Sequence, residues 1–225
     1  MILLRNIAFY LAFYLGSVVL VSRSVIALLI APHTLYEVIK AWPRWQRTCL
    51  KHIIGMNLRI EGQPLDEPAF YAFKHESFFE AIDVPLLIEK PVIFAKEELF
   101  RIPGWGRAAR HYGIIPVSRT AGASALRAMF TALRGFTKEG RSVVIFPEGT
   151  RVPHGASPEL RSGFAGLYKQ AKLPVVPVAV YSGPLYHRWL KRPGTIIVRF
   201  TEAIPAGLPR DEIEARTRAG MNALN

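Results

Sequence analysis

A histidine and a carboxylate lie five residues apart in the segment Lys74-His75-Glu76-Ser77-Phe78-Phe79-Glu80. An alcohol is a poor nucleophile until its proton is withdrawn, and a neutral imidazole can withdraw it near pH 7. The imidazole in turn needs a carboxylate that holds its tautomer and stabilises the imidazolium. Within one ideal helix, five residues turn two side chains about 140° apart. His75 therefore meets Glu80 only if it lies at the turn before a helix, and the pattern then predicts a general base.

The same segment lacks a second metal ligand. His75-Glu76 begins as the His-Glu-x-x-His zinc motif does, but Phe79 stands where the second histidine belongs. Cys49 is the single cysteine, which excludes an internal disulfide and a cysteine-rich zinc site. We interpret it as a small buried apolar residue. We expect this chain to hold no metal.

A second polar cluster, Phe146-Pro147-Glu148-Gly149-Thr150-Arg151, follows an apolar run. Gly149 lets the backbone turn tightly. Thr150 and Arg151 offer hydrogen-bond donors that suit phosphate oxygens. In isolation, the cluster fits a turn with a surface ion pair equally well.

A third cluster, Gly113–Arg119, ends in a basic residue. Arg119 closes an apolar run, so its guanidinium is expected to emerge at the edge of a sheet and to add a second phosphate contact. All three clusters directly follow predicted strands, which is where α/β proteins place their sites. We expect the three clusters to share one edge of the sheet.

From about residue 55, short β-rich runs alternate with helical stretches. The expected strands are Leu58–Glu61, Phe70–Phe73, Val92–Ala95, Ile114–Val117, Val143–Phe146, Val175–Tyr181 and Ile196–Phe200. The expected helices are Ser77–Ile88, Trp105–His111, Ala121–Lys138, Ser162–Lys172 and Asp211–Leu224. Thr120 can cap the third helix. The alternation predicts an α/β fold with a mixed central sheet of about seven strands flanked by helices.

The N-terminus is apolar. Residues Ile7–Ser22 carry no charge, and after Arg23 the apolar run resumes through Ser24–Pro32. As a helix, this run is long enough to cross the ~30 Å hydrocarbon layer. Either the segment spans the bilayer once, or Arg23 marks a bend and two helices dip into one leaflet and return. A signal peptide is disfavoured because no clear cleavage site follows the run.

The next segment, Thr34–Ile54, reads as an interfacial helix with a basic face and a Trp-bearing face. Its basic face carries Lys40, Arg44, Arg47 and Lys51, and the other carries Val38, Trp42, Trp45 and Cys49. Pro43 must kink or restart this helix. The alternative interpretation is a helix that packs on the domain and turns its charged face to solvent. We expect residues 1–54 to anchor residues 55–225, a catalytic domain, to the cytoplasmic face of the cell membrane, because basic residues follow the apolar run.

The formal net charge of +12 favours an anionic partner. Nucleic acid, anionic lipid and a phosphorylated or CoA-type substrate all satisfy this charge. Nucleic-acid binding would not require the apolar N-terminal segment, so we expect no nucleic-acid partner. Half of the residues are hydrophobic, which is enough for a sizeable core.

Taken together, the clusters resemble the glycerolipid acyltransferases, the family of lysophosphatidate (1-acylglycerol-3-phosphate) acyltransferases. That family's signature is His-x-x-x-x-Asp, a Gly-to-Arg strand, Glu-Gly-Thr-Arg and a Pro-rich strand. Here the four motifs read His75–Glu80, Gly113–Arg119, Glu148–Arg151 and Pro174–Val178, and the intervening segment reads Lys96–Leu99 with Ile102–Gly104. The order and spacing agree over about residues 58–205, and four motifs in order are far more specific than one.

The resemblance implies transfer of a fatty acyl chain from acyl-CoA or acyl-carrier protein to the free sn-2 hydroxyl of lysophosphatidate, which forms phosphatidate without a cofactor. The implied partners are the lipid bilayer, a lysophospholipid acceptor and the thioester donor. The implied base and its orienting carboxylate are His75 and Glu80. The implied phosphate-binding residues are Arg119, Glu148, Gly149, Thr150 and Arg151, with Ser77 and Lys96 as supporting residues.

Three positions depart from the family pattern: Glu80 replaces the usual Asp, Lys74 replaces a common Asn, and Ser118 replaces a frequent acidic residue. These departures concern acceptor specificity more than reaction type. The acceptor is therefore also compatible with another lyso-lipid or with glycerol 3-phosphate. A hydrolase is disfavoured because the chain has no Gly-x-Ser-x-Gly elbow. A non-catalytic cationic protein on the membrane surface leaves the His–carboxylate spacing unexplained.

Overall fold

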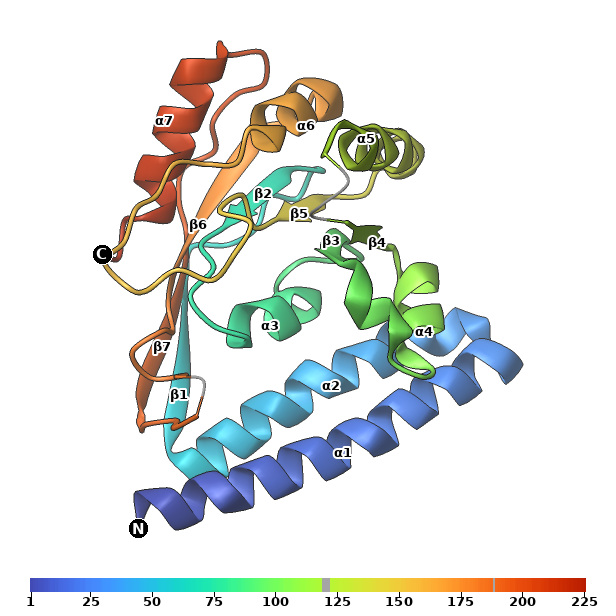
Figure 1. The fold of residues 1–225 in the computed structure, drawn as a ribbon, viewed down its shortest axis with the longest axis vertical. Coiled ribbons are helices and arrows are strands. Elements are labelled where there is room, and N and C mark those ends of the chain that lie inside the picture. The colour runs from blue at the N-terminus through green and yellow to red at the C-terminus, as the bar shows by residue number, and fades with distance from the viewer. Residues whose placement is uncertain (119–121, 188) are drawn as a thin grey trace.

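The computed structural model describes residues 1–118, 122–187 and 189–225. Its centre is a seven-stranded sheet in the order β1-β7-β6-β2-β5-β3-β4 (Figure 1). The strands are β1 (Met56–Glu61), β2 (Phe70–Phe73), β3 (Val92–Lys96), β4 (Ile114–Val117), β5 (Val143–Ile145), β6 (Val175–Tyr181) and β7 (Gly194–Phe200). Neighbouring strands run parallel except β6 and β7, which pair antiparallel. The predicted mixed sheet is confirmed.

Helices cover both faces of the sheet (Figure 1). The helical segments after the first strand are α3 (Phe79–Leu87), η3 (Glu97–Arg101), α4 (Trp105–Tyr112), α5 (Gly122–Lys138), α6 (Gly163–Ala171) and α7 (Arg210–Met221). Phe70 and Ala72 of β2 pack in one core with α5, α6 and α7. Tyr71 and Phe73 pack in the other core with α1 and α3. Because both faces of β2 are buried, its sequence is apolar throughout instead of alternating.

Strand β2 lies between β5 and β6 and runs parallel to both. The carboxyl ends of the three strands therefore lie at one edge of the sheet. The segments that follow Phe73, Ile145 and Tyr181 meet there, and these segments supply the polar side chains described below.

The N-terminal apolar segment forms helix α1 (Ile2–Ile30), which a short 3₁₀ turn (Pro32–Thr34) joins to α2 (Leu35–Cys49). Of the two arrangements left open by the sequence, the one with a bend at Arg23 is excluded, because α1 continues through this position with the Arg23 side chain on its exposed face. Pro43 does not restart α2. Trp42 and Trp45, on either side of Pro43, both donate hydrogen bonds to α1 and fasten this part of α2 to it. A π-helical turn, η2 (Leu50–Ile54), leads from α2 into β1.

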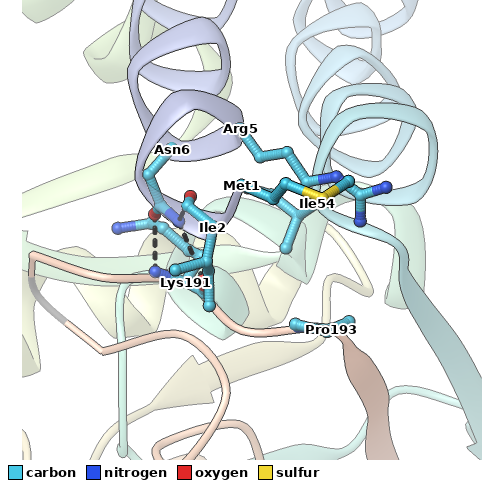
Figure 2. Close-up of a pocket in the computed structure, with 7 residues that line it drawn as sticks. All are labelled: Met1, Ile2, Arg5, Asn6, Ile54, Lys191 and Pro193. Carbon is cyan, nitrogen blue, oxygen red and sulfur yellow. Dashed lines mark hydrogen bonds between the residues drawn. The ribbon is translucent and has the colours of Figure 1, made fainter.

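Helix α1 is attached to the rest of the molecule near both ends. Near its N-terminus, the Asn6 side chain accepts the Lys191 N–H at 2.6 Å and donates to the Lys191 carbonyl at 2.9 Å (Figure 2). Near its C-terminus, Ala27 packs in a small buried cluster with Leu35 and Ala108 of α4. Both ends of α1 therefore contact the part of the chain that contains the sheet.

The remaining face of α1 is apolar and exposed. Its exposed large hydrophobic side chains are Ile2, Leu3, Leu4, Ile7, Leu11, Tyr14, Leu15, Val18, Val19, Ile26, Leu29 and Ile30. Among the helices that the structure describes, α1 alone is long and apolar enough to be a candidate membrane span. This surface suggests, weakly, that the protein associates with a membrane.

Candidate active site

His75 lies in the β2–α3 turn (residues 74–78), after the last strand hydrogen bond of β2. That bond runs from the Lys74 N–H to the Val178 carbonyl at 2.9 Å. Nδ1 of His75 is 3.0 Å from Oε1 of Glu80, in the first turn of α3. The predicted geometry is therefore present: the histidine precedes the helix and the carboxylate reaches back to it.

Glu80 is fully buried and accepts hydrogen bonds at both oxygens. Besides His75, its Oε1 accepts the backbone N–H groups of Glu76 at 2.7 Å and Ser77 at 2.6 Å. Its Oε2 accepts the hydroxyls of Ser77 at 2.8 Å and Ser182 at 2.9 Å. Burial raises the pKa of Glu80, but the hydrogen bond and charge of His75 and the Ser77 N–H outweigh it, so this pKa lies below its ordinary value. Glu80 is thus an ionised carboxylate.

Because Nδ1 of His75 faces Glu80, the second ring nitrogen, Nε2, is the one that can meet a substrate. The His75 ring packs against Phe146 with the ring centroids 4.4 Å apart, and 15 % of the His75 side chain is exposed. An ionised Glu80 accepts a hydrogen bond from the Nδ1–H of a neutral imidazole. The lone pair of Nε2 is then the proton acceptor. The arrangement can therefore withdraw a proton from a bound hydroxyl.

The β5–α6 loop (residues 146–162) binds the β2–α3 turn through buried Glu148. Oε2 of Glu148 accepts the His75 backbone N–H at 3.0 Å, and Oε1 pairs with the Lys74 ammonium at 3.0 Å. Lys74 also donates to the Ala156 carbonyl and, at 2.7 Å, to the Asn222 side chain. Burial raises the pKa of Glu148, and the bonds from His75 and Lys74 oppose that shift. Glu148 thus faces the turn.

The next three residues of the loop turn outward. Gly149 has a φ of +69°, and a Cβ there would lie 3.0 Å from the Arg161 side chain, so the predicted tight turn is present. Thr150 and Arg151 are exposed. The Arg151 guanidinium lies over the ring of Phe78, 4.1 Å from its centroid. The structure therefore brings Thr150 and Arg151 to the surface beside the His75 turn.

The remaining predicted site residues lie elsewhere. Ser77 hydrogen-bonds Glu80, as described. Lys96 ends β3 and forms a surface ion pair with Glu98 at 3.0 Å. Arg119 and Thr120 lie outside the described residues.

Ser182 was missed by sequence reasoning. It is buried directly after β6, where its hydroxyl donates to Glu80 and lies 2.8 Å from the Ser77 hydroxyl. Polar residues that directly follow a strand tend to form the site, and Ser182 directly follows β6. This position could have identified Ser182 from the sequence. The Ser182 backbone N–H also donates to Glu76, which pairs with His154. Neither Glu76 nor His154 was singled out, because they are 78 residues apart and only the fold joins them.

Two hollows lie away from His75. One of about 220 Å³ lies at the start of α1, between Arg5, Ile54 and Pro193 (Figure 2). Another of about 360 Å³ lies beside β1 and is lined largely by apolar side chains, including Phe79 next to Glu80.

No group of His, Cys, Asp or Glu able to hold a metal ion occurs among the residues described.

Comparison with known sequences identifies the family. The family model described as Acyltransferase matches residues 56–181. The 1-acyl-sn-glycerol-3-phosphate acyltransferase of Pseudomonas aeruginosa is 30 % identical over 75 % of this chain and 67 % of its own length. The enzyme of that name from Cocos nucifera is 30 % identical over 69 % of this chain and 52 % of its own. The chain thus spans about half to two thirds of these relatives.

The same fold occurs in a solved structure. The crystal structure of the 1-acyl-sn-glycerophosphate acyltransferase PlsC from Thermotoga maritima superposes with a TM-score of 0.81 and 21 % identity. The match covers 99 % of this chain and 95 % of that one, so it includes the N-terminal helices. With its strand-end clusters, its fold and the family match over residues 56–181, this chain belongs to the acyltransferase family that includes the 1-acyl-sn-glycerol-3-phosphate acyltransferases.

Proposed function

We propose that this chain is a 1-acylglycerol-3-phosphate O-acyltransferase. It transfers a fatty acyl chain from the thioester of acyl-CoA or acyl-carrier protein to the sn-2 hydroxyl of lysophosphatidate, which yields phosphatidate. The observation that carries this proposal is the contact of 3.0 Å between His75 and buried Glu80. The names of the relatives support the choice of acceptor.

In the proposed reaction, Nε2 of His75 accepts the proton of the sn-2 hydroxyl as its oxygen attacks the thioester carbonyl. The carbon–oxygen bond forms, and the tetrahedral intermediate then expels the thiolate. The imidazolium returns its proton to the thiolate sulfur, so the base is regenerated. Glu80 stabilises the imidazolium during this cycle, and its lowered pKa keeps it ionised for that role.

We assign the acceptor phosphate to Thr150 and Arg151, which are exposed beside the turn that carries His75. Arg151 offers paired N–H donors that suit phosphate oxygens. Arg119 is proposed as a further phosphate contact. Because side chains supply both proton transfer and charge, the proposed step requires no metal or prosthetic group.

We further propose that residues 1–54 anchor residues 55–225 to the cytoplasmic face of the cell membrane without crossing it. At ~1.5 Å per residue, α1 is long enough to span. However, Asn6 and Ala27, near its two ends, both bind the rest of the molecule. A spanning helix cannot hold both ends against a domain on one side, so α1 lies in one leaflet with its apolar face toward the lipid tails.

The test supplies purified protein with radiolabelled acyl-CoA or acyl-carrier protein and a panel of acceptors. The panel holds lysophosphatidate, lysophosphatidylcholine and glycerol 3-phosphate. We expect labelled phosphatidate from lysophosphatidate at the highest rate. Faster acylation of lysophosphatidylcholine or glycerol 3-phosphate would contradict the acceptor, and no acylation by either donor would contradict the reaction.

A further inference from the structure

A second histidine–carboxylate pair lies beside the first. Nδ1 of His154 is 2.9 Å from Oε1 of Glu76, and the His154 ring meets Tyr181 edge-on at 4.7 Å between centroids. The Glu76 side chain is fully buried, whereas 26 % of the His154 side chain is exposed. The pair mirrors His75 and Glu80, yet no step of the proposed reaction uses it.

Glu76 and Glu80 are both hydrogen-bonded to the segment that follows β6. Oε2 of Glu76 accepts the backbone N–H groups of Ser182 at 2.9 Å and Gly183 at 2.8 Å. The Ser182 hydroxyl at the same time donates to Glu80 at 2.9 Å. A buried network with these bonds holds its members in place. His154 is therefore bonded to a fixed point at the end of β6.

The β5–α6 loop contains no helix or strand, so its shape depends on the contacts of its side chains and backbone. Before Arg151, Glu148 accepts the His75 N–H. After Arg151, the Val152 N–H donates to the His75 carbonyl at 2.8 Å, and His154 binds Glu76 two residues later. The part of the loop that presents Arg151 is thus tied to the catalytic turn on both sides.

We propose that His154 is a positioning residue which, through Glu76, holds Arg151 at the distance from His75 that a phosphate-bearing acceptor requires. The inference rests on the function proposed above. Loss of the bond leaves the single Val152–His75 backbone bond as the tie after Arg151, so this side of the loop is held less firmly. Arg151 then samples more orientations and binds the acceptor phosphate less tightly. Donor binding and proton transfer at His75 do not depend on this bond.

The test compares His154→Leu with His154→Asn. Leucine is similar in size but has no donor, whereas the asparagine amide places an N–H close to the position of the imidazole Nδ1. We expect His154→Leu to raise KM for lysophosphatidate about tenfold, with kcat and the donor KM within about twofold of wild type. His154→Asn should restore most of the acceptor affinity. His111→Leu, which removes an exposed histidine of α4, serves as the matched control and should change neither constant.

An unchanged acceptor KM in His154→Leu, or an asparagine variant no better than the leucine variant, overturns the positioning role. Circular dichroism and thermal unfolding check that each variant is folded. If the leucine variant does not fold, His154→Gln replaces it, because glutamine keeps a polar group but moves the donor away from Glu76. Wild type that forms no phosphatidate contradicts the proposed function itself, and active wild type with unaltered variants contradicts only the inference.

Discussion

At the scale of single residues, Glu80 combines two tasks that sequence patterns treat separately. Ser77-x-x-Glu80 has the spacing of a helix capping box, and the Glu80 carboxylate accepts the Ser77 N–H at 2.6 Å as one half of that motif does, although α3 begins at Phe79 with Phe78 as its N-cap. The same oxygen faces His75 at 3.0 Å. The extra methylene of Glu relative to Asp lets one carboxylate reach both the helix start and the imidazole.

Replacing Glu80 by Gln should lower kcat by roughly 10²–10⁴-fold. The amide retains the size of the side chain but removes the charge that stabilises the imidazolium. Steady-state kinetics with saturating lysophosphatidate measure the effect. Glu98→Gln, which removes a carboxylate from a surface ion pair, is the control and should retain wild-type kcat. Equal activity in the two variants contradicts the role of Glu80.

Arg151→Ala should raise KM for lysophosphatidate by roughly tenfold to a hundredfold, the size expected for loss of a charge-assisted contact. The donor KM should change far less. Initial rates at varied acceptor and then at varied donor concentration separate the two constants. A larger rise in the donor KM would place the acceptor phosphate elsewhere.

The catalytic pair could be predicted because His75 and Glu80 are close in sequence. Ser182 and His154 could not be paired with their carboxylates, because the contacts join residues 102 and 78 positions apart. Only the parallel pairing of β2 with β5 and β6 brings these segments together. Glu148 belongs to the expected motif, yet its contacts are with Lys74 and His75 inside the protein.

At the scale of elements, apolar runs located the strands well because the central strands are buried on both faces. Phe70–Phe73 and Val175–Tyr181, two of these central strands, have the bounds that the sequence predicts, and the edge strand Ile114–Val117 has them too. The sequence left a bend at Arg23 open as one of two arrangements, and the helix has none there because a long charged side chain can extend from an exposed helix face without breaking the helix. Helix α2 also continues through Pro43, where the side chains of Trp42 and Trp45 bind α1, and no local pattern contains these tertiary contacts.

Gly149→Ala should lower the free energy of unfolding by about 1–2 kcal/mol. Its φ of +69° lies in the left-handed region, and the new Cβ would approach Arg161 to 3.0 Å. Gly135→Ala is the control with the opposite sign. It lies within α5 with open space around it, so alanine there should stabilise by about 0.5–1 kcal/mol. Thermal unfolding measures both, and a stabilised Gly149→Ala would contradict the strained turn.

At the scale of the whole molecule, the N-terminal helices form part of the body. Phe9 and Phe13 of α1 belong to the same core as Tyr71 and Phe73 of β2. The sequence showed that α1 is apolar, but it could not show which face is covered, because that depends on α2 and α4. The outcome is a helix with one face in the protein core and the other exposed.

Cysteine labelling tests the proposed position of α1 in the membrane. In a Cys49→Ser background, Arg5→Cys and His33→Cys mark the two ends of α1 at exposed polar positions, and Glu98→Cys marks the catalytic part. In a bacterial host, we expect a membrane-impermeant maleimide to label all three only after lysis, because all three lie on the cytoplasmic side. Labelling of one α1 end in intact spheroplasts would show that the helix spans.

The central claim is that His75 withdraws the proton from the acceptor hydroxyl. Its most direct test measures phosphatidate formation from lysophosphatidate and acyl-CoA by wild type and His75→Ala, with both substrates saturating and both proteins shown to be folded. The account predicts a fall in turnover of roughly 10²–10⁴-fold in the variant, the size of a general-base contribution. Turnover of the variant close to that of an active wild type would contradict the account.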